Sequence, residues 1–516
     1  MSMTSLTTIW RTLLGSLIVA MLMWPALYNG QPFFFSDTTA YIRGADAGVQ
    51  AAFHHRTPWS LTGEEAIEKD PTSQADASPA HRSLSSIKDK TVLSGRSPYY
   101  GALLYLGELT GGFWLSVAFQ SLAVLAGLML ALRAAGPPTW PTLAAMSMCI
   151  AVASTAPFFV SFLMPDVFAG VAILVASALL SIHNRLQPPD YVLAFALLCF
   201  SVVVHDSHVL ILAILLAFAT IRHLLTRSWP NWRGMAVIAA TLIVAVLAQA
   251  GFSTAVRKVV GAPPIHLPFL MARTIEDGPG ERYLRATCPG NGFKVCLYLD
   301  RLPITADAFL WGAEPKGVFA TASPEVRRQL SNEQTRFVIA VVAYDLLGQL
   351  SASLKNIGSQ LTMIGLREFE YDDELAVKIP NEHLRRMRES AASRGAMPLA
   401  VFSMLNLAAV LASIAVIACA IAWPAYRARV PRSVAELSMW LAVAILINAA
   451  ICGALSGPHD RYSTRVVWLI PTIASLIGAA LLERKGNSFD EAGRRPVLRP
   501  RLGASLPRGL GSPFPV

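Results

Sequence analysis

An acidic residue and a tyrosine follow three consecutive phenylalanines near the start of the chain, in Phe33-Phe-Phe-Ser-Asp37-Thr-Thr-Ala-Tyr41-Ile-Arg43. Apolar surroundings raise the pKa of a carboxyl group, as a general base requires. A helix would place Asp37 and Tyr41 on one face, because they are four residues apart. We therefore expect Asp37 to be a catalytic base, with Tyr41 and Arg43 close to the substrate. The alternative is that Asp37, or Ser36 before it, only caps a helix.

A second acidic residue, Asp166, follows Pro165 in a short turn between two apolar segments. A carboxylate this close to lipid is costly unless it is paired or functional. Either it caps the helix that follows, or it faces the same cavity as Asp37 and takes part in catalysis. The sequence leaves both interpretations open.

Two histidines lie three residues apart in His205-Asp-Ser-His208, again between apolar segments. The cluster resembles part of a metal site, but a dedicated site needs three or four ligands. We expect His205 and His208 to bind substrate through hydrogen bonds, or to belong to the turn. A divalent metal ion as cofactor is left open, with no ligands assigned.

Cations gather in Gly457-Pro-His459-Asp-Arg461-Tyr462-Ser-Thr-Arg465, just before the last apolar segment. The two arginines are four residues apart, so a helix would present both on one face. A guanidinium group is suited to bidentate contact with phosphate. We expect His459, Arg461, Tyr462 and Arg465 to bind substrate. The alternative is anchoring of the chain at the membrane interface by arginine and aromatic side chains.

The elements that hold these residues are membrane spans. Of the 516 residues, 54 % are hydrophobic and 15 % charged, whereas a soluble domain has about 25 % charged residues. The apolar residues form blocks of roughly 18 to 25, enough to cross a bilayer as helices. The first block continues into Gln31 without a small-residue cleavage site, so we expect an anchor and not a signal peptide. The sequence predicts an all-α polytopic protein with spans at 9–28, 113–134, 141–163, 167–183, 190–205, 208–225, 234–253, 398–424, 433–456 and 465–483.

The net charge is +10, and the basic residues are distributed as expected for a membrane protein. Most Lys and Arg residues lie in alternate short connections and in the C-terminal tail, the pattern of cytoplasmic segments. This distribution argues against nucleic-acid binding. We expect a multi-pass protein of the bacterial inner membrane with both termini in the cytoplasm.

Four regions follow from this topology. Residues 1–253 form an N-terminal transmembrane module, and the first periplasmic loop, 29–112, lies within it. Residues 254–397 form a periplasmic domain, 398–484 a second transmembrane module, and 485–516 a basic cytoplasmic tail whose composition predicts disorder. Within the outer regions we expect an interfacial helix after Arg96, in Arg96-Ser-Pro-Tyr-Tyr-Gly-Ala-Leu-Leu-Tyr-Leu, and one surface helix over 336–366.

Two of the six cysteines lie in the second outer region. Cys288 and Cys296 are separated by seven residues, and the compartment outside the bacterial inner membrane is oxidising. We expect a disulfide between them; the alternative is a pair of free thiols.

Several enzyme and transporter classes lack support in the sequence. There is no phosphate-binding loop ending in Lys-Ser or Lys-Thr, no Gly-x-Ser-x-Gly elbow, and no pair of matching broken helices in two halves. An ATP-driven pump, an α/β-hydrolase and an inverted-repeat transporter are therefore disfavoured.

The loop motifs resemble those of the integral-membrane GT-C glycosyltransferases. The resemblance covers the topology of most of the chain and rests on Ser36-Asp37-Thr-Thr-Ala-Tyr41, Arg96-Ser-Pro-Tyr-Tyr-Gly-Ala-Leu-Leu, Pro165-Asp166 and Arg461-Tyr462. It implies transfer of a hexosyl or pentosyl group from a polyprenyl-phosphate donor to an envelope glycan, lipid or protein on the periplasmic face.

The resemblance also implies roles for single residues. Asp37 would be the base, Asp166 would hold the acceptor or a metal, and Arg461 with Arg465 and Arg96 would hold the lipid phosphate. This chain lacks the double acidic motif of the first loop, which leaves the metal and the donor open. The alternatives are an envelope polysaccharide ligase or polymerase, and a non-catalytic transporter or scaffold.

Overall fold

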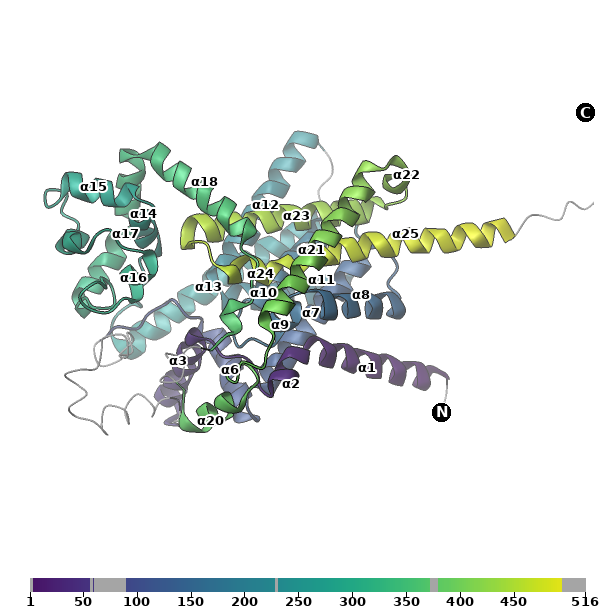
Figure 1. The fold of residues 1–516 in the computed structure, drawn as a ribbon, viewed down its shortest axis with the longest axis horizontal. Coiled ribbons are helices and arrows are strands. Elements are labelled where there is room, and N and C mark those ends of the chain that lie inside the picture. The colour runs from purple at the N-terminus through teal and green to yellow at the C-terminus, as the bar shows by residue number, and fades with distance from the viewer. Residues whose placement is uncertain (1–2, 56–58, 60–89, 228–230, 372–378, 494–516) are drawn as a thin grey trace, which may run out of the picture.

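The computed structural model describes residues 3–55, 59, 90–227, 231–371 and 379–493. Its regular elements in this part of the chain are helices, and extended pairing there is limited to two isolated bridges, Phe33 with Phe162 and Leu93 with Ile265. The described chain is therefore all-α, as the apolar blocks predict (Figure 1).

The helices divide into three groups along the chain. The first contains α1 (Met3–Leu22), α2 (Trp24–Asn29), α3 (Ser36–Phe53), α6 (Pro98–Leu109), α7 (Trp114–Ala135), α8 (Trp140–Ala153), α9 (Ala156–Val160), α10 (Val167–Leu180), α11 (Pro188–Val204), α12 (Asp206–Thr226) and α13 (Trp232–Val260). The second contains α14 (Phe269–Glu276), α15 (Pro279–Thr287), η2 (Lys294–Arg301), α16 (Ala306–Trp311), α17 (Pro324–Tyr344), α18 (Leu346–Thr362), η3 (Arg367–Phe369) and α20 (Asn381–Glu389). The third contains α21 (Leu399–Ala422), α22 (Pro424–Arg427), α23 (Arg432–Ile451), the π-helical η4 (Cys452–Ser456), α24 (Asp460–Val467) and α25 (Leu469–Gly493).

Helix α10 is the centre of the main core. All fourteen of its residues are buried, and it packs against α7, α11 and α23. A helix that is apolar on every side is stable only when surrounded in this way. Gly170 allows the close approach of Trp468, whose indole nitrogen would lie 2.5 Å from a Cβ at that position. The helices packed around α10 fix the positions of the polar turns that precede α10 and α12.

Among the described residues, six helices are long and apolar enough to cross a membrane: α7, α12, α13, α21, α23 with η4, and α24 with α25 over Asp460–Leu482. The bent pair α17 and α18 would be a seventh if it formed one span. Four shorter apolar helices, Ile9–Leu22 of α1, α8, α10 and α11, coincide with the other predicted spans. The multi-pass all-α architecture is confirmed, while the count of ten spans stays a prediction.

Three predicted helices are broken in the structure. The span 9–28 divides into α1 and α2, and the span 141–163 divides into α8 and α9. The predicted surface helix over 336–366 is α17 and α18, bent by 106°. The bend lies at Asp345, whose Oδ1 accepts a hydrogen bond of 2.9 Å from the backbone of Gly348 and so begins a new helix.

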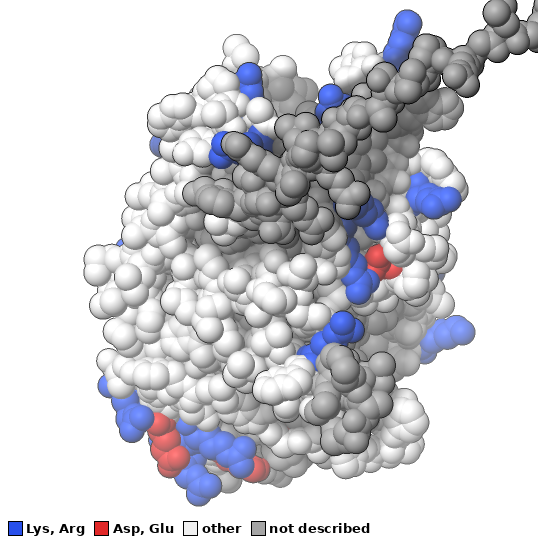
Figure 2. Space-filling view, turned by 90° about the vertical axis from the view of Figure 1, so that its right-hand side faces the viewer, with Lys and Arg blue, Asp and Glu red and all other residues white. Residues whose placement is uncertain are grey.

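The second outer region has its own hydrophobic core, built from residues between Ile265 and Val341. Cys288 and Cys296 are joined there by the expected disulfide. Figure 1 shows α14 to α17 at the end of the molecule opposite to both the start of α1 and the end of α25. Figure 2 views the side on which those two helix ends lie, and more basic than acidic side chains are visible there. The division into four regions and the orientation in the membrane stay predictions.

Candidate functional site

Helix α24 carries both arginines of the Gly457 to Arg465 motif into the interior. Arg465 is fully buried, and 12 % of the Arg461 side chain is exposed. Interfacial anchoring requires charged groups that reach the lipid headgroups and water, so that interpretation is wrong for Arg465. Both side chains approach Asp166, of which 2 % is exposed.

Arg465 is held by four side chains from three different parts of the chain. Its Nη1 lies 3.3 Å from Oδ1 of Asp166, and its Nη2 lies 3.2 Å from Oγ of Ser207, 3.1 Å from Oδ1 of Asn448 and 3.3 Å from Sγ of Cys452. A buried charge is tolerated when it is paired and hydrogen-bonded in this way. Arg465 therefore ties the turn before α10, the start of α12 and the end of α23 to α24.

Arg461 has a different environment. Its guanidinium carbon lies 4.6 Å from the ring centre of Phe35 and 5.2 Å from that of Tyr462, and its Nε is 3.7 Å from Oδ1 of Asp166. Nε and Nη1 are buried, and neither has a hydrogen-bond partner in the described chain. Unbonded N–H groups on a buried cation favour an anionic ligand, because leaving them unsatisfied is costly.

Asp37 is paired with Arg96, which precedes α6. The Arg96 guanidinium lies 5.9 Å from the ring centre of Trp311, in the second outer region. Burial alone would lower the pKa of Arg96, but Asp37 and Tyr41 outweigh it and raise the pKa above its ordinary value. Arg96 is thus kept charged.

Each aspartate lies at the start of a helix. The N-cap residue of α3 is Phe35, Asp37 lies in the first turn, and Thr38 accepts a 2.9 Å hydrogen bond from the Phe35 backbone. Asp166 occupies the N-cap position of α10, but its side chain makes no capping hydrogen bond. Both carboxylates contact arginine.

Tyr41 is buried on the same helix as Asp37, with its ring 5.2 Å from that of Tyr100. Burial raises the pKa of Tyr41, and among the nearby charges Arg96 lowers it while Asp37 and Asp166 raise it further. The phenol therefore remains protonated and keeps a hydrogen-bond donor close to both aspartates. Arg43, six residues after Asp37, projects about 240° around the helix from it. Burial lowers the pKa of Arg43.

The histidine pair lies beside this cluster. His205 caps α12 through Nδ1, which accepts from the Ser207 backbone at 3.2 Å, and His208 donates from Nδ1 to the Ser201 carbonyl at 2.7 Å. The two rings lie 5.1 Å apart. Burial lowers the pKa of His205 well below its ordinary value, assisted by His208 and Arg465. The neutral imidazole of His205 thus supports the turn that brings Ser207 to Arg465.

The remaining predicted residues lie at the edge of the site. His459 is partly exposed, with Nε2 3.9 Å from Asp307, and its backbone N–H donates to Gln360 at 3.0 Å. The ring of Tyr462 packs beneath both arginines. Its hydroxyl lies 3.1 Å from that of Ser456.

Four contributors were not predicted from the sequence: Ser207, Trp311, Glu368 and Asn448. Glu368 lies close enough to Arg461 to interact with it electrostatically, and burial raises the pKa of this glutamate, although Arg461 opposes the shift. Asn448 could have been suspected as an isolated amide in an apolar span. The sequence around Glu368 and Trp311 does not indicate a functional role, because only the fold brings these two residues to the site.

The described residues do not form a metal site. They contain no group of three or more His, Cys, Asp and Glu side chains that could hold a metal ion. Asp37 and Asp166 are both paired with arginine. No chemical step is therefore derived through a metal here.

Comparisons with known proteins found similarity to solved structures only. No protein-family model and no curated protein matches it. It is similar to the archaeal oligosaccharyltransferase AglB from Archaeoglobus fulgidus, in complex with an inhibitory peptide and a dolichol-phosphate, with 13 % identity and a TM-score of 0.41 over 96 % of this chain and 53 % of that one. It is also similar to ArnT from Cupriavidus metallidurans, bound to undecaprenyl phosphate, with 13 % identity and a TM-score of 0.33 over 94 % of this chain and 80 % of that one. This chain spans about half the length of the archaeal enzyme.

Proposed function

We propose that this chain is a membrane glycosyltransferase that moves a hexosyl or pentosyl group from a polyprenyl-phosphate carrier to an envelope glycan, lipid or protein outside the cytoplasm. The observation that carries the proposal is the guanidinium of Arg461. It is buried beside Asp166, and its Nε and Nη1 have no hydrogen-bond partner in the described chain. A phosphate oxygen would satisfy both groups.

Arg461 would act on the leaving group. When the bond between the anomeric carbon of the sugar and the phosphate oxygen breaks, negative charge grows on that oxygen. A guanidinium held in position by Phe35 and Tyr462 stabilises this charge without having to reorganise. Arg96 would contribute a second cation from the opposite side of the site.

Asp37 would act on the acceptor. Its carboxylate takes the proton of the acceptor hydroxyl as the oxygen attacks the anomeric carbon, and the polyprenyl phosphate leaves. Its partner Arg96 would hold the carboxylate in position beside the acceptor. Tyr41, one turn along α3, would donate a hydrogen bond to the substrate.

Asp166 receives a positioning role in this proposal, in place of the catalytic one expected from the sequence. It lies between Arg461 and Arg465 and is shared by both. It would hold Arg461 in the orientation that a phosphate needs, while Arg465 and His205 support the surrounding turns.

The experiment is a comparison of lipid-linked sugars by mass spectrometry in cells with and without the protein. Loss of the protein should cause one polyprenyl-phosphate sugar to accumulate and one envelope glycan to lose that sugar. Accumulation of a lipid-linked oligosaccharide chain would indicate a ligase or polymerase. Unchanged lipid-linked sugars and glycans would contradict the proposal.

A further inference from the structure

The segment 33–35 separates two regions of the molecule. Arg461, Arg465 and Asp166, called the arginine cluster below, lie on one side of it, and a cavity lies on the other. Phe33 pairs with Phe162 in an isolated bridge, so the segment is extended and successive side chains point to opposite sides. Phe35 contacts Arg461, whereas Phe34 lines a cavity of about 250 Å³. The cavity is therefore separate from the site described above.

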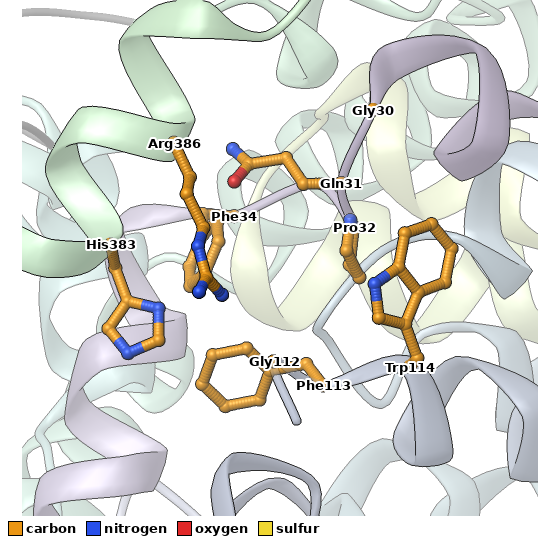
Figure 3. Close-up of a pocket in the computed structure, with 9 residues that line it drawn as sticks. All are labelled: Gly30, Gln31, Pro32, Phe34, Gly112, Phe113, Trp114, His383 and Arg386. Atoms are coloured by element: carbon orange, nitrogen blue, oxygen red, sulfur yellow. The ribbon is translucent and has the colours of Figure 1, made fainter. Parts of the chain in front are cut away.

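Three parts of the chain form the cavity. They are the residues after α2, the turn before α7, and helix α20. Figure 3 shows His383 and Arg386 reaching in from α20 and facing Phe113 and Trp114. The two α20 residues are three apart and share one helix face. The lining consists of Gly30, Gln31, Pro32, Phe34, Gly112, Phe113, Trp114, His383 and Arg386.

The turn before α7 has an unusual backbone. Gly111, Gly112 and Phe113 have successive φ values of 112°, 82° and 71°. A positive φ is unfavourable for a bulky residue such as phenylalanine and persists only when its surroundings fix it. The Phe113 ring is fixed against Phe34, with centroids 5.5 Å apart. A Cβ on Gly112 would lie 3.3 Å from Nη1 of Arg386, so glycine leaves room for the guanidinium.

The charged group that faces the cavity is Arg386. Its nearest acidic partner is Glu382 at 3.9 Å, and both side chains are more than half exposed. His383 is buried and makes a 2.9 Å hydrogen bond from Nε2 to Oε1 of Glu108, while Oε2 of that carboxylate is buried without a hydrogen-bond partner in the described chain. The cavity thus combines aromatic walls with a guanidinium fork suited to an oxyanion.

We propose that this cavity binds one anionic sugar unit. The apolar face of the sugar ring would lie against Trp114, because Phe113 is fully buried, and its carboxylate or phosphate would accept hydrogen bonds from Arg386. A volume of about 250 Å³ is sufficient for one sugar ring. That the bound sugar belongs to the acceptor rests on the proposed transferase function. The binding of an anionic sugar to the cavity does not depend on that function.

The test is direct binding to the purified full-length protein, measured by calorimetry or ligand-observed NMR. The probes are glucuronic acid, glucose 1-phosphate, glucose and inorganic phosphate. At least one of the two anionic sugars should bind about tenfold or more tightly than both glucose and inorganic phosphate, because a charge-assisted hydrogen bond adds to the ring contact. The anionic sugar that binds best identifies the carboxylate or the phosphate as the recognised group.

Variants locate the binding. Arg386→Gln and Trp114→Leu should each weaken binding of the anionic sugar about tenfold. The matched control is Arg385→Gln, an exposed neighbour on α20 that does not line the cavity. Equal melting temperatures would show that the variants are folded.

Three results would overturn the proposal: no binding of either anionic sugar, equal binding of inorganic phosphate, or unchanged affinity in Arg386→Gln. Failure of the transferase function is recognised separately. Asp37→Asn should bind the anionic sugar as well as the wild type, since Asp37 does not line the cavity. A loss of sugar transfer in that variant would therefore arise from the site at Asp37 and not from the cavity.

Discussion

Arg461 and Arg465 lie one turn apart on α24 and approach the same oxygen of Asp166, at 3.7 Å and 3.3 Å respectively. Their surroundings differ. Arg465 is fully buried and bonds to four partners through Nη1 and Nη2, which leaves only its Nε without a hydrogen-bond partner, whereas both Nε and Nη1 of Arg461 have none in the described chain. Arg465 therefore stabilises the fold, and we infer that Arg461 binds the substrate.

Replacing Arg465 should destabilise the protein. Arg465→Met leaves Asp166 buried with only the longer contact to Arg461, at an expected cost of about 3 kcal/mol. Thermal denaturation of the detergent-solubilised protein measures this loss. Adding Asp166→Asn should restore part of the stability, because the uncompensated charge is removed; a double variant less stable than Arg465→Met would contradict the pairing.

Replacing Arg461 should affect ligand binding far more than stability. We expect Arg461→Gln to bind undecaprenyl phosphate at least tenfold more weakly, since it loses charge-assisted hydrogen bonds to the phosphate. Arg367→Gln is the control, because 88 % of that side chain is exposed. Equal affinities of the two variants and the wild type would show that Arg461 does not hold the phosphate.

The protein should lose stability in mild acid partly through His205. Burial lowers the pKa of His205 well below 6.5, so below about pH 6.5 the unfolded chain takes up a proton that the folded protein does not. Stability should therefore fall as the pH falls from 6.5 to 5. His205→Asn keeps an acceptor for the Ser207 backbone and should show a smaller drop in melting temperature. The same drop in variant and wild type would contradict this account.

The disulfide should be visible by mass spectrometry. Alkylation of the denatured protein without a reductant should leave Cys288 and Cys296 unmodified, and reduction should add two alkyl groups. Closing a loop of this length contributes about 2–3 kcal/mol in the chain-entropy model. The double variant Cys288→Ser and Cys296→Ser should accordingly melt at a lower temperature, and unaltered melting would indicate that the bond contributes little.

The sequence predicted most helices because lipid imposes their length and composition. The predicted span 113–134 corresponds to α7 at Trp114–Ala135, for example. The break between α8 and α9 had a local signal in Pro157, whose ring cannot follow a helical carbonyl at Ala153, and the predicted span 141–163 passed over it. Within the break, Thr155 donates a 2.7 Å hydrogen bond to the carbonyl of Thr464. The bend at Asp345 had a local signal, an aspartate that can cap a helix, which the apolar periodicity on both sides obscured.

The candidate site was predictable in its residue types but not in its pairings. The outer turns supplied Asp37, Asp166 and the two arginines, since charged residues between apolar spans are easily recognised. Which arginine bonds through both of its terminal nitrogens depends on partners such as Ser207 and Asn448, more than 200 residues apart in the chain. No local pattern encodes that distinction.

Sugar transfer by the purified protein in liposomes tests the central claim most directly. The donor is the lipid extract of cells that lack the protein, in which the polyprenyl-phosphate sugar should accumulate. Wild type and the exposed control Asp300→Asn should consume the donor and release polyprenyl phosphate, whereas Asp37→Asn should be slower by about 10²-fold or more, because it lacks the base. Donor consumption by Asp37→Asn at the wild-type rate would contradict the account.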